Sequence, residues 1–266
     1  MKKQNITDLA TFLEEDLGRG DVTSESLFPK TREAHGTVCA AEPGILAGLE
    51  EASLLAASVG LKITTYAIDG DDFLPGQVVV ELTGAARAVL GIERTMLNMM
   101  SHMSGVATAT SRAITAVTEA HTGLHADNPP RITATRKTLP GLRMFQKKAV
   151  VLGGGLPHRI DLAEAVLIKD NHLMIATDIV AALVRVRDRV EGLPIEIEVE
   201  SLPDALIAAE AGADCLLLDN FEPEDIVEIV NALRSASLRD AVSLEASGGI
   251  TIDTVSRYAD TGVDFI

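Results

Sequence analysis

The sequence predicts an α/β protein built from two parts. In the second half of the chain, short apolar runs that end in polar residues recur every ~20–30 residues and alternate with stretches of helical periodicity. This β-α-β-α pattern is typical of parallel strands that are joined by helices. The first ~110 residues mix helices and strands in another order, which indicates a separate α+β domain. We therefore expect one domain at residues 1–112 and a second at residues 113–266.

Hydrophobic periodicity predicts the elements of the first part. Helices are expected at residues 6–17, 49–59 and 85–120, and strands at residues 34–41, 61–66 and 75–82. The segment at residues 121–130 contains Gly and two prolines, so it ends the long helix and forms a connection.

The second part has its own series of elements. Strands are expected at residues 165–171, 195–200, 215–220, 242–249 and 263–266, with helices around residues 179–186 and 204–209. Ser201 and Pro203 mark the start of a helix, Gly212 marks its end, and Thr251 is a candidate cap for another helix. Periodicity does not distinguish an open sheet from a closed barrel, but both place catalytic groups at the carboxyl ends of the strands.

Composition and charge exclude several classes of protein. The formal net charge of −16 would repel a nucleic-acid backbone, and the chain has 3% aromatic residues and no Trp to stack on bases. No apolar run reaches the ~18–20 residues of a membrane span, and the start turns polar and acidic before a signal sequence could form. We expect a cytoplasmic protein. Cys39 and Cys215 lie among apolar neighbours, which predicts two inert core thiols.

One stretch of this acidic chain is basic. Residues 131–172 contain eight Lys and Arg residues against three acidic ones, a net charge of +5, so the remainder of the chain carries −21. A basic island of this kind predicts a site for a compact, multiply charged anion. The alternative is a solvated basic helix face, although the cations are interleaved with turn residues rather than spaced at i, i+4.

The island holds two groups of candidate anion ligands. Thr135, Arg136 and Lys137 precede a Pro-Gly turn, and a Gly-rich loop at residues 153–155 is followed by His158 and Arg159. Arg binds a carboxylate or phosphate through two parallel hydrogen bonds, which Lys cannot do.

Further candidates lie at predicted strand ends. Lys169, Glu198 and Asp219 would converge if the strands run parallel, where they could bind a charged substrate, hold a hydrated divalent metal or stabilise a developing cation. Glu196, Glu198 and Glu200 alternate along one strand face, and structural ion pairing is the alternative interpretation of this trio. Ser247, Gly248 and Gly249 would join a strand to a helix N-terminus, which favours phosphate, although the same residues could simply start a helix.

Several motifs occur in an order that resembles a known family. They are the acidic and Gly residues of 14–23, Glu93–Asn98 with His102–Thr108, Thr135–Arg143, Gly153–Arg159, Leu167–His172, Glu198, Leu218–Phe221 and Ser247–Gly249. From about residue 12 to the end, the chain resembles the quinolinate phosphoribosyltransferases, also called nicotinate-nucleotide pyrophosphorylases (carboxylating).

The resemblance implies a fold, a reaction and an assembly. It implies an N-terminal α/β sandwich and an incomplete, seven-stranded α/β barrel. The reaction joins quinolinate to phosphoribosyl pyrophosphate with Mg²⁺ and releases nicotinate mononucleotide, pyrophosphate and CO₂ for NAD biosynthesis. The assembly is a homodimer, in some members a larger oligomer such as a hexamer, whose sites are completed by the neighbouring subunit.

The resemblance also implies residue roles. Arg136, His158, Arg159 and Lys169, with Arg94 of the neighbouring chain, would bind the quinolinate carboxylates, and Thr135 would be a further substrate-binding residue. Lys137 would meet the pyrophosphate or ribosyl portion. Glu198 and Asp219 would hold ribose hydroxyls and the metal-bound diphosphate, and Ser247, Gly248 and Gly249 would take the 5′-phosphate. Lys137, Glu198 and Asp219 are thus the candidate catalytic residues.

The chain departs from the family pattern at a few positions. Ala134 stands where many members have Asp, Lys148 stands where Tyr is common, and residues 121–130 form a longer connection. The chain also ends at Ile266, before a further Gly- and Ala-rich strand end and a helix of its relatives, so we expect a truncated C-terminus.

Three other functions are alternatives to the pyrophosphorylase. A related protein encoded beside molybdate transporters shares the fold, but Lys169–His172 and Glu93-Arg94 favour the pyrophosphorylase. An aldolase that forms a Schiff base at Lys169 would need an apolar pocket, whereas Arg and His are close in the sequence. The third is a non-catalytic anion-binding protein.

Overall fold

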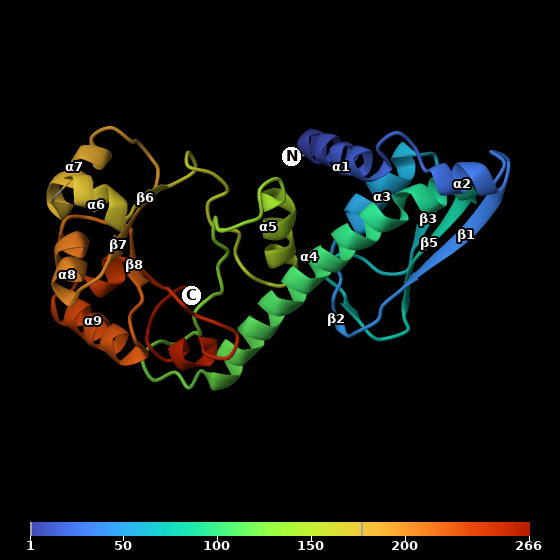
Figure 1. Ribbon diagram of the computed structural model, residues 1–266. Coiled ribbons are helices and arrows are strands. Elements are labelled where there is room, and N and C mark those ends of the chain that lie inside the picture. Colours follow the sequence, from blue (N-terminus) through green and yellow to red (C-terminus); the bar gives the residue numbers. More distant parts are fainter. Residues whose placement is uncertain (1, 177) are drawn as a thin grey trace. The chain divides into compact units, whose positions relative to one another are not determined.

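Two units make up the structure, a computed structural model that describes residues 2–176 and 178–266 (Figure 1). The first unit holds the chain up to Ser111 together with Lys137–Gly154, and the second holds Arg112–Arg136 together with Gly155–Ile266. The long helix α4 (Ala86–Ala120) contributes to both. The predicted domain boundary between residues 112 and 113 stays a prediction, because compact units and family domains need not coincide.

The first unit is an α/β sandwich. Its helices are α1 (Lys2–Leu17), α2 (Val22–Leu27), α3 (Leu49–Ser58), the first part of α4 and α5 (Arg143–Leu152). Its strands are β1 (Glu33–Cys39), β2 (Gly44–Ile45), β3 (Lys62–Thr65), β4 (Asp72–Phe73) and β5 (Val78–Ala85). β5 pairs with β1 and β3 in an antiparallel sheet, and β2 pairs with β4. The predicted helices and strands of this part are confirmed, whereas α2 and α5 were not predicted.

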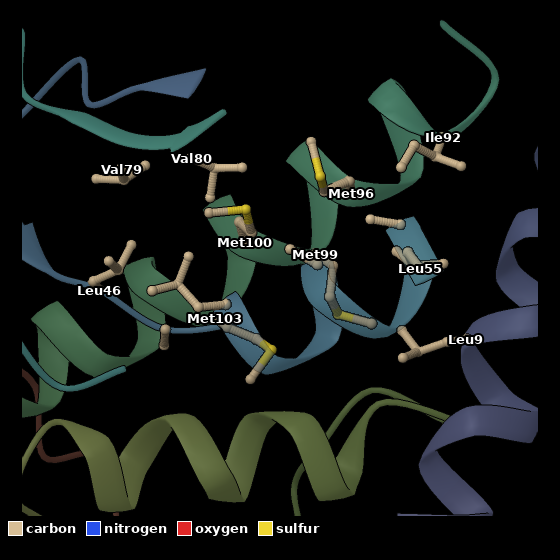
Figure 2. Close-up of a cluster of buried hydrophobic side chains, with 14 of the residues drawn as sticks. Leu9, Leu46, Leu55, Val79, Val80, Ile92, Met96, Met99, Met100 and Met103 are labelled. Carbon is tan, nitrogen blue, oxygen red and sulfur yellow. The ribbon is translucent and has the colours of Figure 1, made fainter. Parts of the chain in front are cut away.

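A methionine-rich stripe of α4 supplies much of the first core. Met96, Met99, Met100 and Met103 recur at three- and four-residue spacing, so they lie on one face of the helix. All four are buried, and Figure 2 shows them in one cluster with side chains of α1, α3 and β5. Burial of this stripe fixes α4 against the sheet of the first unit.

The second unit is built on a parallel sheet. Its strands β6 (Val166–Ile168), β7 (Ile195–Val199), β8 (Cys215–Asp219) and β9 (Ser243–Ser247) pair in that order. The helices α6 (Asp170–Ala176) and α7 (Ile179–Arg187) follow β6, α8 (Leu202–Glu210) follows β7, and α9 (Pro223–Ser235) follows β8. Short 3₁₀ helices, η1 (Arg239–Ala241) and η2 (Val255–Tyr258), precede and follow β9. The Ser201 side chain accepts from the amide of Asp204, which confirms the predicted helix start.

Single parallel bridges extend this sheet into a partial barrel. Phe265 bridges both Glu245 of β9 and Arg131, and Thr133 bridges Leu156. The order is therefore β6, β7, β8, β9, then extended segments at Phe265, residues 131–133 and Leu156. No bridge joins Leu156 to β6 among the residues that the structure describes. The prediction of an incomplete α/β barrel is confirmed.

The strands of the barrel separate apolar from polar side chains. On β7, Ile195 and Ile197 are fully buried in the core shared with α8 and α9. Glu196 and Glu198 alternate with them and face the opposite way, into the barrel. The interior of this barrel is therefore acidic where the helix-facing layer is apolar.

Three sequence predictions are wrong in detail. Cys39 is exposed and therefore not a core thiol, although both cysteines are free. Glu200 lies beyond the end of β7 and is exposed, so it does not share the buried face of Glu196 and Glu198. After β9, turn residues lead to the four-residue η2 instead of an α-helix that begins near Thr251. Within residues 2–176 and 178–266, no helix combines the length and apolar character needed to cross a membrane.

Candidate active site

Strand register in the second unit brings polar side chains to one place. Glu198 of β7 is level with Leu217 of β8, which is level with Glu245 of β9. Two residues further along the same strands, Asp219 of β8 is level with Ser247 of β9. Residues that share a level in a parallel sheet point to the same face, so these groups face the barrel interior near the carboxyl ends of the strands.

A salt bridge joins the ends of β6 and β7. The Nζ atom of Lys169 lies 2.9 Å from Oε2 of Glu198, whose side chain is only 7% exposed. The Lys169 side chain is 43% exposed, so it neutralises a buried carboxylate while its ammonium group stays accessible to a ligand. This contact is the ion pairing that we considered for the alternating glutamates.

A second polar contact lies two residues earlier on β7, where Glu196 meets His158. His158 Nε2 lies 3.1 Å from Oε2 of Glu196, and the His158 backbone has a φ of +49°. A non-Gly residue in this left-handed region is uncommon and is found mainly where the surroundings hold it there. His158 Nδ1 and Glu196 Oε1 are both buried, and neither has a hydrogen-bond partner among the described residues.

Two guanidinium groups accompany these pairs. Arg159 donates from Nη1 to the carbonyl of Ala165 at 3.0 Å. Burial lowers the pKa of Arg159, and the positive charge of Arg136 lowers it further, against the opposing effect of Glu196. Arg136 and Arg159 are therefore close enough to repel each other, an arrangement that an anion between them would relieve. Together with Lys169, they form a group of cations beside the face of β7.

The loops after β8 and β9 contact each other. The Asn220 amide donates to the carbonyl of Ser247 at 2.8 Å, and the Asn220 side chain donates to Asp219 at 2.5 Å. Gly248 has a φ of +92°, and a Cβ added there would lie 2.6 Å from the Asn220 backbone nitrogen. Only Gly fits this position. The predicted phosphate site at residues 247–249 is therefore a Gly-containing loop. No α-helix begins directly after it, so a helix dipole does not contribute to this site.

The remaining predicted site residues are exposed. Thr135 lies in the second unit, next to Arg136. Lys137 belongs to the first unit, as does Arg94, which is exposed on α4. The structure therefore brings together Arg136, His158, Arg159, Lys169 and Glu198 on the β7 face, and places Asp219 and residues 247–249 at the neighbouring strand ends. Lys137 and Arg94 stay predictions.

Two residues of the site were not predicted. Glu245 of β9 is 8% exposed, and Thr133 donates to its carboxyl at 3.3 Å. Its neighbours Leu244 and Ala246 are buried on the helix side, so alternation along the predicted strand gives the signal that Glu245 faces the interior.

Two groups of three side chains bring ligand-type atoms within 4.8 Å of one another. One comprises His158, Glu196 and Glu245, and the other comprises Asp170, Glu198 and Glu200. In the first group the histidine and a glutamate already contact each other. The second group consists of carboxylates alone, the ligand type that Mg²⁺ prefers.

Comparison with known proteins covers nearly the whole chain. Residues 106–266 match the family model of the quinolinate phosphoribosyl transferase C-terminal domain, and residues 21–104 match that of the N-terminal domain. A probable nicotinate-nucleotide pyrophosphorylase (carboxylating) of Methanothermobacter thermautotrophicus is 43% identical over 252 residues, which span 94% of this chain and 88% of that protein.

Further relatives agree in sequence and in structure. The nicotinate-nucleotide pyrophosphorylase (carboxylating) of Mycobacterium leprae is 40% identical, with 96% of this chain and 88% of that protein covered. The structure of the nicotinate-nucleotide pyrophosphorylase of Francisella tularensis superposes with a TM-score of 0.87 at 32% identity, with 100% of this chain and 90% of that chain covered.

Proposed function

Because the chain belongs to the quinolinate phosphoribosyl transferase family, we propose that it transfers the 5-phosphoribosyl group of phosphoribosyl pyrophosphate to quinolinate. The acceptor loses CO₂, and the products are nicotinate mononucleotide and pyrophosphate, as in NAD biosynthesis. The observation that carries this proposal is the group of cations beside the face of β7: Arg136, Arg159 and Lys169. Like charges repel, so Arg136 and Arg159 side by side favour the binding of an anion.

Acceptor binding follows from the charges of the site. Quinolinate is a pyridine dicarboxylate, so it needs several fixed cations at defined positions. Arg136 and Arg159 supply planar guanidinium groups that suit carboxylates, and Lys169 supplies a compact positive charge. His158 and Thr135 complete the acceptor set in this proposal.

In this proposal the donor, phosphoribosyl pyrophosphate, is bound by carboxylates at the strand ends and by the loop at residues 247–249. As C1′ of the ribose separates from the diphosphate oxygen, it gains positive character, which the carboxylates of Glu198 and Asp219 would stabilise. The 5′-phosphate would take backbone amides of the loop at residues 247–249, and Lys137 would neutralise the diphosphate.

The bond changes then balance without a redox cofactor. The ring nitrogen donates its lone pair to C1′, and the electron pair of the broken C1′–O bond leaves with the diphosphate. The bond from the ring carbon to the adjacent carboxyl group then breaks and CO₂ departs. The quaternary nitrogen stabilises the pair left on that carbon until it takes up a proton.

The residues present fit Mg²⁺. Asp170, Glu198 and Glu200 each offer a carboxylate oxygen within 4.8 Å of the others, and Asp219 ends the adjacent strand β8. We propose that Glu198 and Asp219, aided by Asp170 and Glu200, hold the ion largely through the diphosphate. When bound, Mg²⁺ would neutralise charge on the leaving group.

The structure weighs against the aldolase alternative. A lysine that forms a Schiff base must lose its proton, which requires an apolar pocket. Lys169 instead has a 43% exposed side chain whose Nζ atom lies 2.9 Å from the Glu198 carboxylate, so its surroundings are polar. Borohydride in the presence of a carbonyl substrate should therefore trap no adduct.

A direct assay tests the proposed function. The purified chain is incubated with quinolinate, phosphoribosyl pyrophosphate and Mg²⁺, and nicotinate mononucleotide is measured by chromatography. We expect one pyrophosphate and one CO₂ for each nucleotide, and much less product when nicotinate replaces quinolinate. Absence of nucleotide under all metal conditions would refute the proposal.

A homodimer with shared sites is part of the same proposal. Arg94 is exposed on α4, and in this proposal its guanidinium group reaches the site of the neighbouring subunit. Arg94→Ala and Lys169→Ala should each be inactive alone. After the two are mixed and allowed to exchange subunits, about a quarter of the sites should be intact, because half of the dimers are hybrids with one complete site.

A matched mixture controls for this result. Lys169→Ala mixed with Arg136→Ala combines two defects of the acceptor site, and it should regain no activity. Equal recovery in both mixtures, or in neither, would argue against a shared site.

A cytoplasmic location also belongs to this proposal, since the free thiols of Cys39 and Cys215 suit a reducing compartment.

A further inference from the structure

Glu245 carries a buried carboxyl group that the proposed reaction does not use. It lies on β9 and is 8% exposed, in the interior of the barrel. One atom of its carboxyl, one of Glu196 and one of the His158 ring all lie within 4.8 Å of one another. Glu245 therefore adjoins the proposed acceptor site through the contact between Glu196 and His158.

The hydrogen bonds around this group leave one acceptor unsatisfied. Glu196 Oε2 contacts His158 Nε2, while Oε1 of the same carboxylate is buried without a partner among the described residues. A buried carboxylate oxygen normally has a donor, because leaving it without one is costly. Thr133 donates to Oε1 of Glu245, so a proton on Oε2 of Glu245 would supply that donor.

The charges that face Glu245 favour this proton. Burial, and then the negative charge of Glu196, raise the pKa of Glu245 to about 7, against the opposing effects of His158 and Thr133. On β8, Cys215 also faces inward, and its thiol stays protonated because burial raises its pKa, as do Glu196 and Glu245. Glu196 itself contacts His158 Nε2, and it is close enough to Arg159 to oppose the lowering of the Arg159 pKa.

We propose that Glu245 is a positioning residue that works in its neutral form, in which it donates a hydrogen bond to Glu196 and so holds His158 ready for the acceptor. Glu196 then accepts from Glu245 on one oxygen and from His158 Nε2 on the other. The contact of Nε2 with Glu196 then fixes the orientation of the His158 ring, whose side chain is 19% exposed. This inference rests on the proposed function, because it assigns His158 to quinolinate.

Loss of the Glu245 proton should weaken acceptor binding. An ionised Glu245 donates nothing to Glu196 and adds a second buried negative charge, which repels a dianionic acceptor. The wild-type KM for quinolinate should therefore rise roughly tenfold between about pH 6 and about pH 8.5, with a much smaller change in kcat.

Two variants separate the charge from the hydrogen bond. Glu245→Gln cannot ionise and still donates an N–H to Glu196, so its KM should stay low and independent of pH over this range. Glu245→Ala removes the donor, so its KM should be raised at every pH. Glu210→Gln, an exposed position on α8, is the matched control and should behave like the wild type.

The outcomes distinguish this inference from the proposed function. If the wild type makes no nicotinate mononucleotide, the proposed function is wrong. If it does, and Glu245→Gln shows the same pH dependence of KM as the wild type, the inference is wrong. Infrared spectra of the wild type give a measurement that needs no variant, because a protonated carboxyl band should disappear between about pH 6 and about pH 8. Its absence at the lower pH would also overturn the inference.

Discussion

Replacing Arg136 or Lys169 with alanine is expected to reduce kcat/KM for quinolinate by ~30- to 5,000-fold, which corresponds to ~2–5 kcal/mol of lost interaction with a buried anion. Arg136 faces the like charge of Arg159, and Lys169 is the accessible end of a salt bridge with Glu198. Each variant therefore removes one of the few charges that can balance the acceptor. Steady-state kinetics with varied quinolinate at saturating phosphoribosyl pyrophosphate measures the loss.

Controls must separate lost chemistry from lost structure. Arg185→Ala removes an exposed arginine of α7 and should retain full activity. Lys169→Ala also leaves the buried Glu198 without its cation, so its thermal unfolding should be compared with that of the double variant Lys169→Ala/Glu198→Gln. Full turnover in both Arg136→Ala and Lys169→Ala would remove the basis of the site assignment.

The strand ends of the second unit could be predicted from the sequence because apolar residues, which face the helices, alternate there with polar residues, which face the barrel interior. Ile195 and Ile197 must face the helices, and Glu196 and Glu198 then face the interior. Where such a run stops, the next polar residue lies at the carboxyl edge of the sheet, as Lys169 and Asp219 do. The cation group could be predicted for the same reason, since it follows from charge and from strand ends.

Other features depend on contacts that no local pattern encodes. The extended segments at residues 131–133, Leu156 and Phe265 are held by single bridges, so they lack the long apolar run of a regular strand. The partnership of Glu245 with His158 joins residues 87 positions apart in the chain, and only closure of the barrel brings them together. The short η2 also depends on tertiary packing, because Val255 and Tyr258 are buried where a longer helix was predicted.

Helix α5 was missed for a different reason, and it carries the largest expected effect on stability. Its basic residues were interpreted as part of an anion site, although Phe145 and Ala149 are spaced for one buried helix face. The Nζ atom of Lys148 on this helix lies 2.8 Å from both Glu50 and Glu51, and 3.6 Å from Asp69. The Glu51 side chain is 1% exposed, so Lys148 neutralises a buried carboxylate of α3.

Lys148→Met is therefore expected to lower the free energy of unfolding by ~3–5 kcal/mol, because it leaves Glu51 charged and buried without a cation. Adding Glu51→Gln should recover part of this loss, whereas Lys62→Met, at an exposed position on β3, should change stability by less than ~0.5 kcal/mol. Urea unfolding monitored by circular dichroism provides the measurement.

The pH dependence of this difference follows from the pKa of Lys148. Burial alone would lower that pKa, but the hydrogen bonds to Glu50 and Glu51 and the charge of Asp69 outweigh burial and raise it. A group whose folded pKa is raised contributes its full stability below the unfolded value of ~10.4 and loses it as pH rises through the folded value. The gap between wild type and Lys148→Met should thus be constant near neutral pH and shrink only in strong alkali. A gap that closes near neutral pH would contradict the raised pKa of Lys148, and a gap that persists unchanged through strong alkali would mean that packing of the lysine stem, and not its charge, holds α5 against α3.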